Sequence, residues 1–375
     1  EKENGSKLDY EMKKKVKIVL LVGTRPNIVK ISQFRRVFSQ FENFELKIIH
    51  SNQHYSESVS SVFFTQFGIE ADAILPHYSG NASAHMGHII EHLTMELMKD
   101  IPELLIVVGD VNSTLAGAIV GNKLGVKLAH LESGLRSYDR QMPEEINRII
   151  VDELSDYFFV TEQSGWDNLK EDGKDMNNVF FVGNTMIDSL KAFNKEIHSK
   201  KFSFIYDQSR PYLAMTLHRP SNVDNEKGLL KVLALLKHCS QHFQVIFPMH
   251  PRTKKNIDLF NLTKDFDDVK EVVYTEPLDY FTFQKLIACA DGVITDSGGI
   301  QEETTFIGVP CVTLRENTER PITIDIGTNE LMNFDPPGIL KKLIELGYRK
   351  NQVPPLWDGN ATQRIAEKLN EIYSA

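Results

Sequence analysis

Apolar runs rich in β-branched residues alternate along this chain with longer amphipathic stretches. The first run, VKIVLLVG at Val16–Gly23, is continuous and ends in a turn that contains Gly and Pro. Such a run is typical of a strand buried on both faces, as in a parallel sheet. Similar runs predict further strands in the first half at Leu46–Ile49, Leu104–Val108, Lys127–His130, Tyr157–Val160 and Val179–Val182.

The same alternation returns after a polar stretch, NKEIHSKKFSFIYDQSR at Asn194–Arg210, which predicts a linker. Helices are expected at Glu226–His238 and Tyr280–Ala290. Strands are expected at Tyr212–Thr216, Gln244–Pro248, Glu271–Tyr274, Gly292–Thr295 and Pro310–Leu314.

This order predicts an α/β protein of two successive Rossmann-like domains. We expect the first domain at residues 16–190 and the second at residues 191–360. The amphipathic segment Ala361–Tyr373 can pack on either domain, and we assign it to the first. A length of 375 residues also suits two domains better than one core.

Charge and composition narrow the range of partners. The chain has 42 Lys and Arg against 51 Asp and Glu, a net charge of −9. Such a surface repels a polyphosphate backbone, so we expect no nucleic-acid partner. The sequence has no apolar run long enough to span a membrane, and its charged start is not a signal peptide. We therefore expect a cytoplasmic protein whose residues 1–15 are a disordered arm or a cloning remnant.

The three cysteines, Cys239, Cys289 and Cys311, lie far apart in apolar contexts, which predicts reduced core thiols. The sequence lacks GxGxxG, GxxxxGK[ST] and HExxH, and its His, Asp and Glu do not cluster at metal-ligand spacing. We therefore expect neither a cofactor nor a metal.

Four polar motifs directly follow expected strands, where open α/β sheets bind their ligands. GTRPNIVK brings Arg25 and Lys30 within reach of a phosphate, and GDVNST places Asp110 at a strand tip. TLHRPSNVD places His218 at another tip. Purely structural roles stay open, since Asp110 suits an Asx turn and His218 a structural hydrogen bond.

The fourth motif, TDSGGIQEE, has the clearest physical logic. Ser297, Gly298 and Gly299 lead into a helix whose free N–H groups and positive end favour a diphosphate. Glu303, further along, can accept both hydroxyls of a ribose, and Arg320 in NTERP is the available cation. A structural role stays open here too, in which Ser-Gly-Gly forms only a helix cap and a turn.

A further acidic group lies in HLESGLRSYDRQMPEEINR. Glu144 and Glu145 follow Pro143, and the ordinary interpretation is a solvated first turn of a helix. That interpretation suits Glu145. It does not explain Glu132, which comes directly after a buried strand.

The ordered set of motifs closely resembles the non-hydrolysing UDP-N-acetylglucosamine 2-epimerases, from Val16 to about Asn370. The resemblance rests on GTRP with Lys30, QHY (Gln53–Tyr55), GD with ST, HLESGLR, PEEINR, GNTMID (Gly183–Asp188), the HR pair, EPLDYFTF (Glu276–Phe283), TDSGGIQEE, and TERP followed by GTN (Gly327–Asn329).

The resemblance implies a glycosyltransferase-B type fold with the active-site cleft between the domains, and a cytoplasmic homodimer without a cofactor. It implies reversible C2 epimerisation of UDP-N-acetylglucosamine through elimination and re-addition of UDP, for polysaccharide synthesis. The implied catalytic residues are Asp110, Glu132, Glu144 and His218. The implied UDP-binding residues are Arg25, Lys30, Phe283, Ser297, Gly298, Gly299, Glu303 and Arg320.

The sequence departs from the family at three of these motifs: it has Asn27 where Glu is frequent, HRPSN where HRREN is frequent, and Ser51-Asn52 in place of Thr-Gly before QHY. The departures leave open an activating second UDP-sugar site and a modified UDP-N-acetylhexosamine as substrate. The motifs also leave open a glycosyltransferase of the same fold and a non-catalytic nucleotide-sugar sensor.

Overall fold

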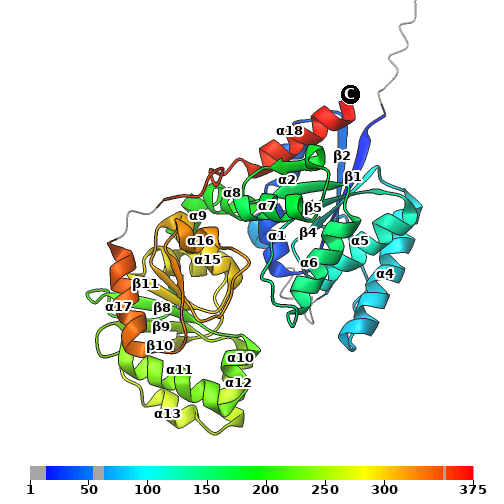
Figure 1. The fold of residues 1–375 in the computed structure, drawn as a ribbon. Coiled ribbons are helices and arrows are strands. Elements are labelled where there is room, and N and C mark those ends of the chain that lie inside the picture. Colours follow the sequence, from blue (N-terminus) through cyan, green and yellow to red (C-terminus); the bar gives the residue numbers. More distant parts are fainter. Residues whose placement is uncertain (1–13, 54–62, 349–351, 375) are drawn as a thin grey trace, which may run out of the picture.

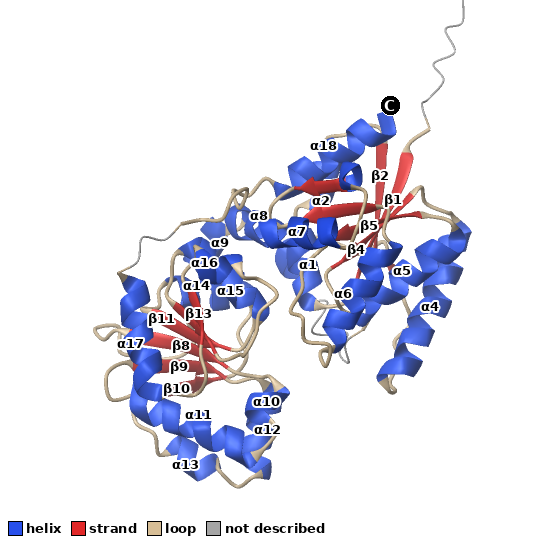
Figure 2. Cartoon of the chain, viewed as in Figure 1, coloured by secondary structure: helices blue, strands red, loops and turns tan. Residues whose placement is uncertain are grey.

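A computed structural model describes residues 14–53, 63–348 and 352–374. Two parallel sheets lie in separate parts of the molecule, each flanked by helices on both faces (Figures 1 and 2). The predicted fold class, α/β with two Rossmann-like domains, is confirmed. Most of the predicted N-terminal arm lies outside the described residues.

The described part of the first sheet has the strand order β3-β2-β1-β4-β5-β6-β7. Leu20 of β1 pairs with Ile48 of β2 and Ile106 of β4, and all three are fully buried. Apolar residues of α4 (Ala82–Lys99) and α5 (Asn112–Leu124) cover one face of the sheet, and those of α1 (Arg25–Ile31), α2 (Phe34–Phe38) and α8 (Thr185–Ala192) cover the other. The strands are β1 (Val16–Val22), β2 (Phe44–His50), β3 (Ala73–Ile74), β4 (Leu104–Val108), β5 (Lys127–Leu131), β6 (Tyr157–Val160) and β7 (Val179–Phe181).

The second sheet has the order β10-β9-β8-β11-β12-β13. The strand order reverses direction between β8 and β11, which opens a crevice at their carboxyl ends. His218 and Ser297 follow these two strands. The strands are β8 (Tyr212–Thr216), β9 (Gln244–Pro248), β10 (Val272–Thr275), β11 (Gly292–Thr295), β12 (Cys311–Thr313) and β13 (Asn329–Leu331).

Helices connect the strands in both sheets, and among those described none has the length and apolar composition needed to cross a membrane. The first group is α1 (Arg25–Ile31), α2 (Phe34–Phe38), α4 (Ala82–Lys99), α5 (Asn112–Leu124), α6 (Pro143–Leu154), α7 (Gln163–Glu171), α8 (Thr185–Ala192) and α9 (Asn194–Ser199). The second is α10 (Pro220–Val223), α11 (Glu226–Cys239), α12 (Pro251–Leu259), α13 (Thr263–Asp267), α14 (Tyr280–Ala288), α15 (Gly298–Ile307), α16 (Ile322–Asp325), α17 (Pro336–Gly347) and α18 (Ala361–Ser374).

Two details differ from the predictions. The expected linker begins with helix α9, which buries Ile197 against the core and so has a reason to be ordered. Cys289 is exposed because it follows the last residue of α14, so the prediction of a core thiol is wrong there and confirmed for Cys239 and Cys311.

The chain crosses back to the first domain at its C-terminal end. Figure 1 shows α18 beside the first sheet, and it packs against α2 and α8. Ile365 and Leu369 of α18 share a buried cluster with Trp357, whose Nε1 donates to the Thr161 carbonyl at 3.0 Å. The exact ranges 16–190 and 191–360 stay a prediction.

Because Trp357 fills the core of the first domain from a distant part of the chain, Trp357→Ala is expected to be strongly destabilising. Removing a buried Trp costs about 3–5 kcal/mol of unfolding free energy. Chemical denaturation followed by circular dichroism measures the loss, with Tyr348→Ala, at an 87% exposed position, as the control. Equal stability of the two variants would show that Trp357 does not support the core.

Candidate active site

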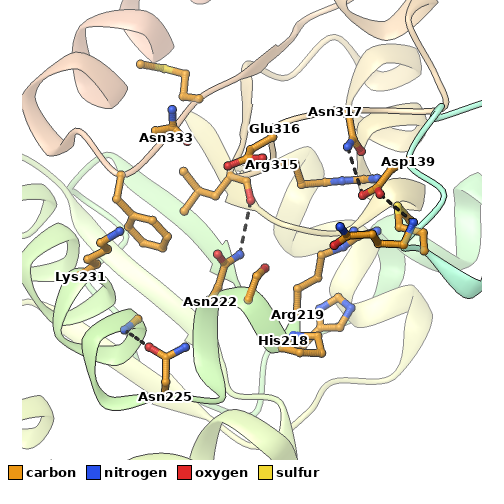
Figure 3. A pocket seen from close by; sticks show the side chains of 18 of the residues that line it. Asp139, His218, Arg219, Asn222, Asn225, Lys231, Arg315, Glu316, Asn317 and Asn333 are labelled. Carbon is orange, nitrogen blue, oxygen red and sulfur yellow. Dashed lines mark hydrogen bonds between the residues drawn. The ribbon is translucent and has the colours of Figure 1, made fainter.

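A cleft of about 1220 Å³ lies between the two domains. The first domain contributes Asp139 and residues 141–144, and the second contributes residues that follow β8, β12 and β13 (Figure 3). Of the predicted site residues, Glu144 and His218 line this cleft. The other predicted residues lie on neighbouring strand and helix ends.

Lys30 and Glu132 form a buried ion pair at the carboxyl ends of β1 and β5. Glu132 has a φ of 71°, a left-handed conformation that is costly for a residue with a side chain. Gly109 makes room for it, because a Cβ at Gly109 would lie 3.2 Å from Glu132 Oε2. The local strain and the burial support a functional interpretation of Glu132.

Asp110 is held by Arg148 of α6. Its Oδ2 accepts from Arg148 Nε at 2.9 Å and from Nη2 at 2.6 Å. Arg148 also donates to Glu145. The Asp110 carboxylate is therefore fixed in orientation, which suits a residue that holds a partner better than one that moves protons.

The solvated interpretation of Glu145 is wrong. Glu145 is 1% exposed and accepts from the backbone N–H groups of Ser137 and Tyr138, both at 2.9 Å. It thereby fixes the loop that precedes α6. Glu144 is the exposed member of the pair and lies in the cleft.

His218 is hydrogen-bonded to Asp296, and its ring still lines the cleft. The His218 Nδ1 lies 3.1 Å from Asp296 Oδ1. Burial raises the pKa of Asp296, but the hydrogen bonds from His218 and from the Arg219 backbone outweigh it and leave that pKa below its ordinary value. A fixed carboxylate therefore orients the imidazole, a common support for an acid–base or phosphate-binding histidine.

The start of α15 has the geometry of an anion site. Ser297 is the N-cap of α15, but in the described structure its hydroxyl makes no capping hydrogen bond. The Ser297 side chain therefore does not act as a helix cap here. A Cβ at Gly298 would lie 3.0 Å from Arg320 Nη1 and 2.9 Å from Glu319 Oε1. The glycine therefore lets Arg320 approach the free N–H groups of the helix.

Arg320 is buried among carboxylates from both domains. Its Nε lies 2.9 Å from Glu302 Oε1, and its Nη2 lies 3.6 Å from Glu132 Oε1. It also pairs with Glu319, which Arg315 contacts at 2.9 Å and Arg148 at 3.9 Å. Burial raises the pKa of Glu319, but the three arginines outweigh it and hold that pKa well below the ordinary value.

The remaining predicted residues occupy the other side of α15 and the facing domain. Glu303 is buried and accepts from the Tyr280 hydroxyl at 3.1 Å, and burial raises its pKa to about 7. Phe283 is half-buried on α14. The Arg25 guanidinium lies 5.5 Å from the Phe63 ring centroid. The pKa of His250 is lowered mainly by burial, then by His218, and the charge of Arg25 adds a smaller effect.

Two residues of the GTRPNIVK and QHY motifs, Asn27 and Gln53, hold neighbouring backbone in place. Asn27, which replaces the frequent Glu, accepts from the N–H groups of Gly23 and Thr24 at 3.1 and 3.2 Å. Gln53 accepts from the Ser113 N–H at 2.9 Å, whereas the rest of the QHY turn lies outside the described residues.

Sequence reasoning missed the partners that complete this site, namely Arg148, Glu162, Glu302 and Glu319. Glu162 follows β6, so the strand-end rule that identified Asp110 and Glu132 also applied to it. No group of three His, Cys, Asp or Glu in the described ranges is arranged to hold a metal ion. The predictions of no metal and no cofactor stay predictions.

Two Rossmann-like domains with charged groups gathered at the facing strand ends define an enzyme of the glycosyltransferase-B architecture. A lipopolysaccharide galactosyltransferase at 12% identity shares that fold, with a TM-score of 0.52.

The chain belongs to the UDP-N-acetylglucosamine 2-epimerase family, whose model matches residues 36–370. The members compared below are isomerases.

Several relatives match almost the whole chain. The UDP-N-acetylglucosamine 2-epimerase of Methanocaldococcus jannaschii is 37% identical, covering 94% of this chain and 99% of the relative. The UDP-2,3-diacetamido-2,3-dideoxy-D-glucuronate 2-epimerase of Pseudomonas aeruginosa is 33% identical, covering 95% and 100%. The crystal structure of the M. jannaschii enzyme with UDP-GlcNAc and UDP has a TM-score of 0.86 at 36% identity, covering 95% of this chain and 100% of that one.

The raised pKa of Glu162 predicts a pH-dependent stability. Burial raises this pKa from 4.5 to about 7, against the opposing effects of Ser164 and Arg320. The folded state then binds the proton more tightly than the unfolded state, so the stabilisation is present below pH 4.5 and is lost as the pH rises to about 7.

Relative to Glu162→Gln, the wild-type unfolding free energy is expected to fall by up to about 3 kcal/mol across that window. Urea denaturation at a series of pH values measures the difference. Glu196→Gln, an exposed change on α9, should run parallel to the wild type. If the unfolding free energy of Glu162→Gln also ran parallel to that of the wild type across the pH series, the raised pKa of Glu162 would be contradicted.

Proposed function

We propose that this chain interconverts UDP-N-acetylglucosamine and UDP-N-acetylmannosamine without net hydrolysis. The observation that carries the proposal is the approach of Glu132 to Arg320, 3.6 Å apart, beside the start of α15. An acid–base candidate from the first domain thereby meets a diphosphate-binding candidate from the second. The full-length similarity to 2-epimerases supports the same conclusion.

The chemistry explains why both groups are needed. C2 has no adjacent carbonyl, so its proton is not acidic enough for simple removal and return. In the proposed route a base removes the C2 proton and UDP leaves C1, which gives a 2-acetamidoglucal with a planar C2. UDP then adds back to C1 while a proton is delivered to the opposite face of C2. A positioned base supplies about 10²–10⁴-fold, so stabilisation of the leaving diphosphate must supply the larger share.

In this mechanism the helix start at Ser297, Gly298 and Gly299 binds the diphosphate, with Arg320 as a counter-charge. The first domain contributes the cations Arg25 and Lys30 of GTRPNIVK to the same diphosphate. The second domain holds the nucleoside end through its remaining predicted residues. These assignments of Arg25, Lys30, Phe283 and Glu303 rest on the motif match and, for Lys30 and Glu303, on their placement on or beside α15.

Inversion requires proton removal on one face of the sugar and delivery on the other. We assign these roles to Glu132 and Glu144, which approach from different elements of the first domain. Asp110 orients the sugar or a neighbouring group, in keeping with its two hydrogen bonds to Arg148. His218, held by Asp296, assists at the sugar or the phosphate.

A modified UDP-N-acetylhexosamine is the second candidate substrate. The 33% identical P. aeruginosa relative and the HRPSN loop favour it. For the assembly we propose a cytoplasmic homodimer that supplies a nucleotide sugar for cell-surface polysaccharide. Support for a subunit contact comes from apolar side chains on and beside α4 that are more than half exposed, namely Ile74, Met95, Met98 and Ile101.

The reaction is tested by NMR of UDP-N-acetylglucosamine with the protein in D₂O. UDP-N-acetylmannosamine should appear, and both it and the remaining UDP-N-acetylglucosamine should carry deuterium at C2, because the elimination exchanges the C2 proton with solvent. A parallel sample with UDP-2,3-diacetamido-2,3-dideoxy-D-glucuronate decides the sugar. Free N-acetylmannosamine and UDP as main products would identify hydrolysis, and transfer to an added acceptor without C2 exchange would identify a glycosyltransferase.

Glu132→Gln and Glu144→Gln should each lower turnover and C2 exchange by about 10²–10⁴-fold, since each removes a proton-transfer group. UDP affinity, measured by calorimetry, should not fall by more than a few-fold, because neither residue is assigned to the nucleotide. Glu196→Gln is the matched surface control. Near wild-type exchange in both variants, with normal UDP binding, would refute the acid–base assignment.

A further inference from the structure

Three carboxylates surround the guanidinium of Arg320, and they differ in what else they contact. Glu132 also pairs with Lys30, and Glu319 also pairs with Arg315. Glu302 is the carboxylate that approaches the Nε edge, at 2.9 Å. The proposed mechanism assigns it no role.

Glu302 reaches this position from the helix that forms the proposed anion site. It lies one turn after Gly298 on α15 and is fully buried. The same oxygen that faces Arg320 Nε accepts from Asn184 Nδ2 at 2.9 Å. Asn184 is the N-cap of α8 in the first domain. Both domains therefore fix the place of this carboxylate.

We propose that Glu302 is a positioning residue for Arg320, which holds the Nε edge and turns the two Nη groups toward the start of α15 and the cleft. A planar guanidinium that is held along one edge has its remaining donors in fixed directions. Nη1 faces the position of the missing Gly298 side chain, and Nη2 faces Glu132. The inference rests on the proposed function, because the diphosphate is the group that those donors would meet.

The incomplete hydrogen bonding of Glu302 supports this role. Its second oxygen, Oε2, is buried and has no hydrogen-bond partner among the described residues. Arg320 Nε has none either, so its 2.9 Å contact with Glu302 is an ion pair and not a hydrogen bond. A buried oxygen without a partner costs free energy. Burial raises the pKa of Glu302, and Arg320 opposes that rise. Arg320 and, to a smaller extent, Lys30 thus favour a charged carboxylate at this position.

A double-mutant cycle on UDP affinity tests the proposal, and calorimetry measures it. Arg320→Ala is expected to weaken UDP binding by about 10–100-fold, the effect of one charged hydrogen-bonding group. Glu302→Ala is expected to weaken it by about tenfold, because Arg320 stays but loses its orientation. The double variant should bind no more weakly than Arg320→Ala alone, since Glu302 acts through Arg320.

Conservative replacement separates positioning from a merely structural role. Glu302→Gln keeps the size of the side chain and an acceptor for Asn184 but removes the charge that faces Nε, so it is expected to restore only part of the affinity lost in Glu302→Ala. A merely structural role would be restored in full. Thermal melting of each variant reports folding, and the Gln cycle replaces the Ala cycle if Glu302→Ala does not fold. Glu196→Gln combined with Arg320→Ala is the control and should have no coupling.

Independent, multiplicative effects of Glu302 and Arg320 on UDP affinity would overturn the positioning role. Unchanged affinity in Arg320→Ala would overturn it together with the diphosphate assignment. If UDP affinity depends on Arg320 but no C2 exchange occurs, the proposed reaction fails. The cycle then still decides the role of Glu302, because it is read from binding.

Discussion

The buried ion pairs around Arg320 are the constraint on which the arrangement of this site depends. Arg320 of the second domain faces Glu132 of the first at 3.6 Å, and Arg148 of the first faces Glu319 of the second at 3.9 Å. Charges removed from water are costly unless each has a partner. The two domains must therefore meet in a way that keeps these pairs together, and that meeting places the strand ends of both sheets on one cleft.

The same cluster explains why buried carboxylates close to one another differ in pKa. Glu319 is in contact with several arginines, whose attraction exceeds the cost of burial and lowers its pKa. Glu162 and Glu303 are also buried but are hydrogen-bonded to neutral groups, so burial prevails and raises the pKa of both to about 7. Proximity to the cations, more than depth of burial, decides which groups hold a proton near neutral pH.

The sequence predicts the fold well because a parallel strand buried on both faces must be a continuous apolar run, as in β4 and β8. Strand β13 reads NEL and buries its polar Asn329 through a hydrogen bond to Thr313, which no hydropathy pattern reveals. The strand-end rule placed Asp110 and Glu132 correctly on the sheet. The burial of Glu145 and the partners of Arg320 depend on tertiary contacts between distant segments, so the sequence alone did not predict them.

Under the proposed mechanism, one arginine links nucleotide binding to the acid–base chemistry. Arg320 faces both the start of α15 and the Glu132 carboxylate. A diphosphate bound at the helix start competes with Glu132 for the same Nη donors, because each of these anions needs a nearby positive charge. Glu132 then keeps Lys30 as its remaining cation. The leaving group would therefore free the carboxylate that the elimination requires from its contact with Arg320, and a protein that has not yet bound nucleotide would keep that contact.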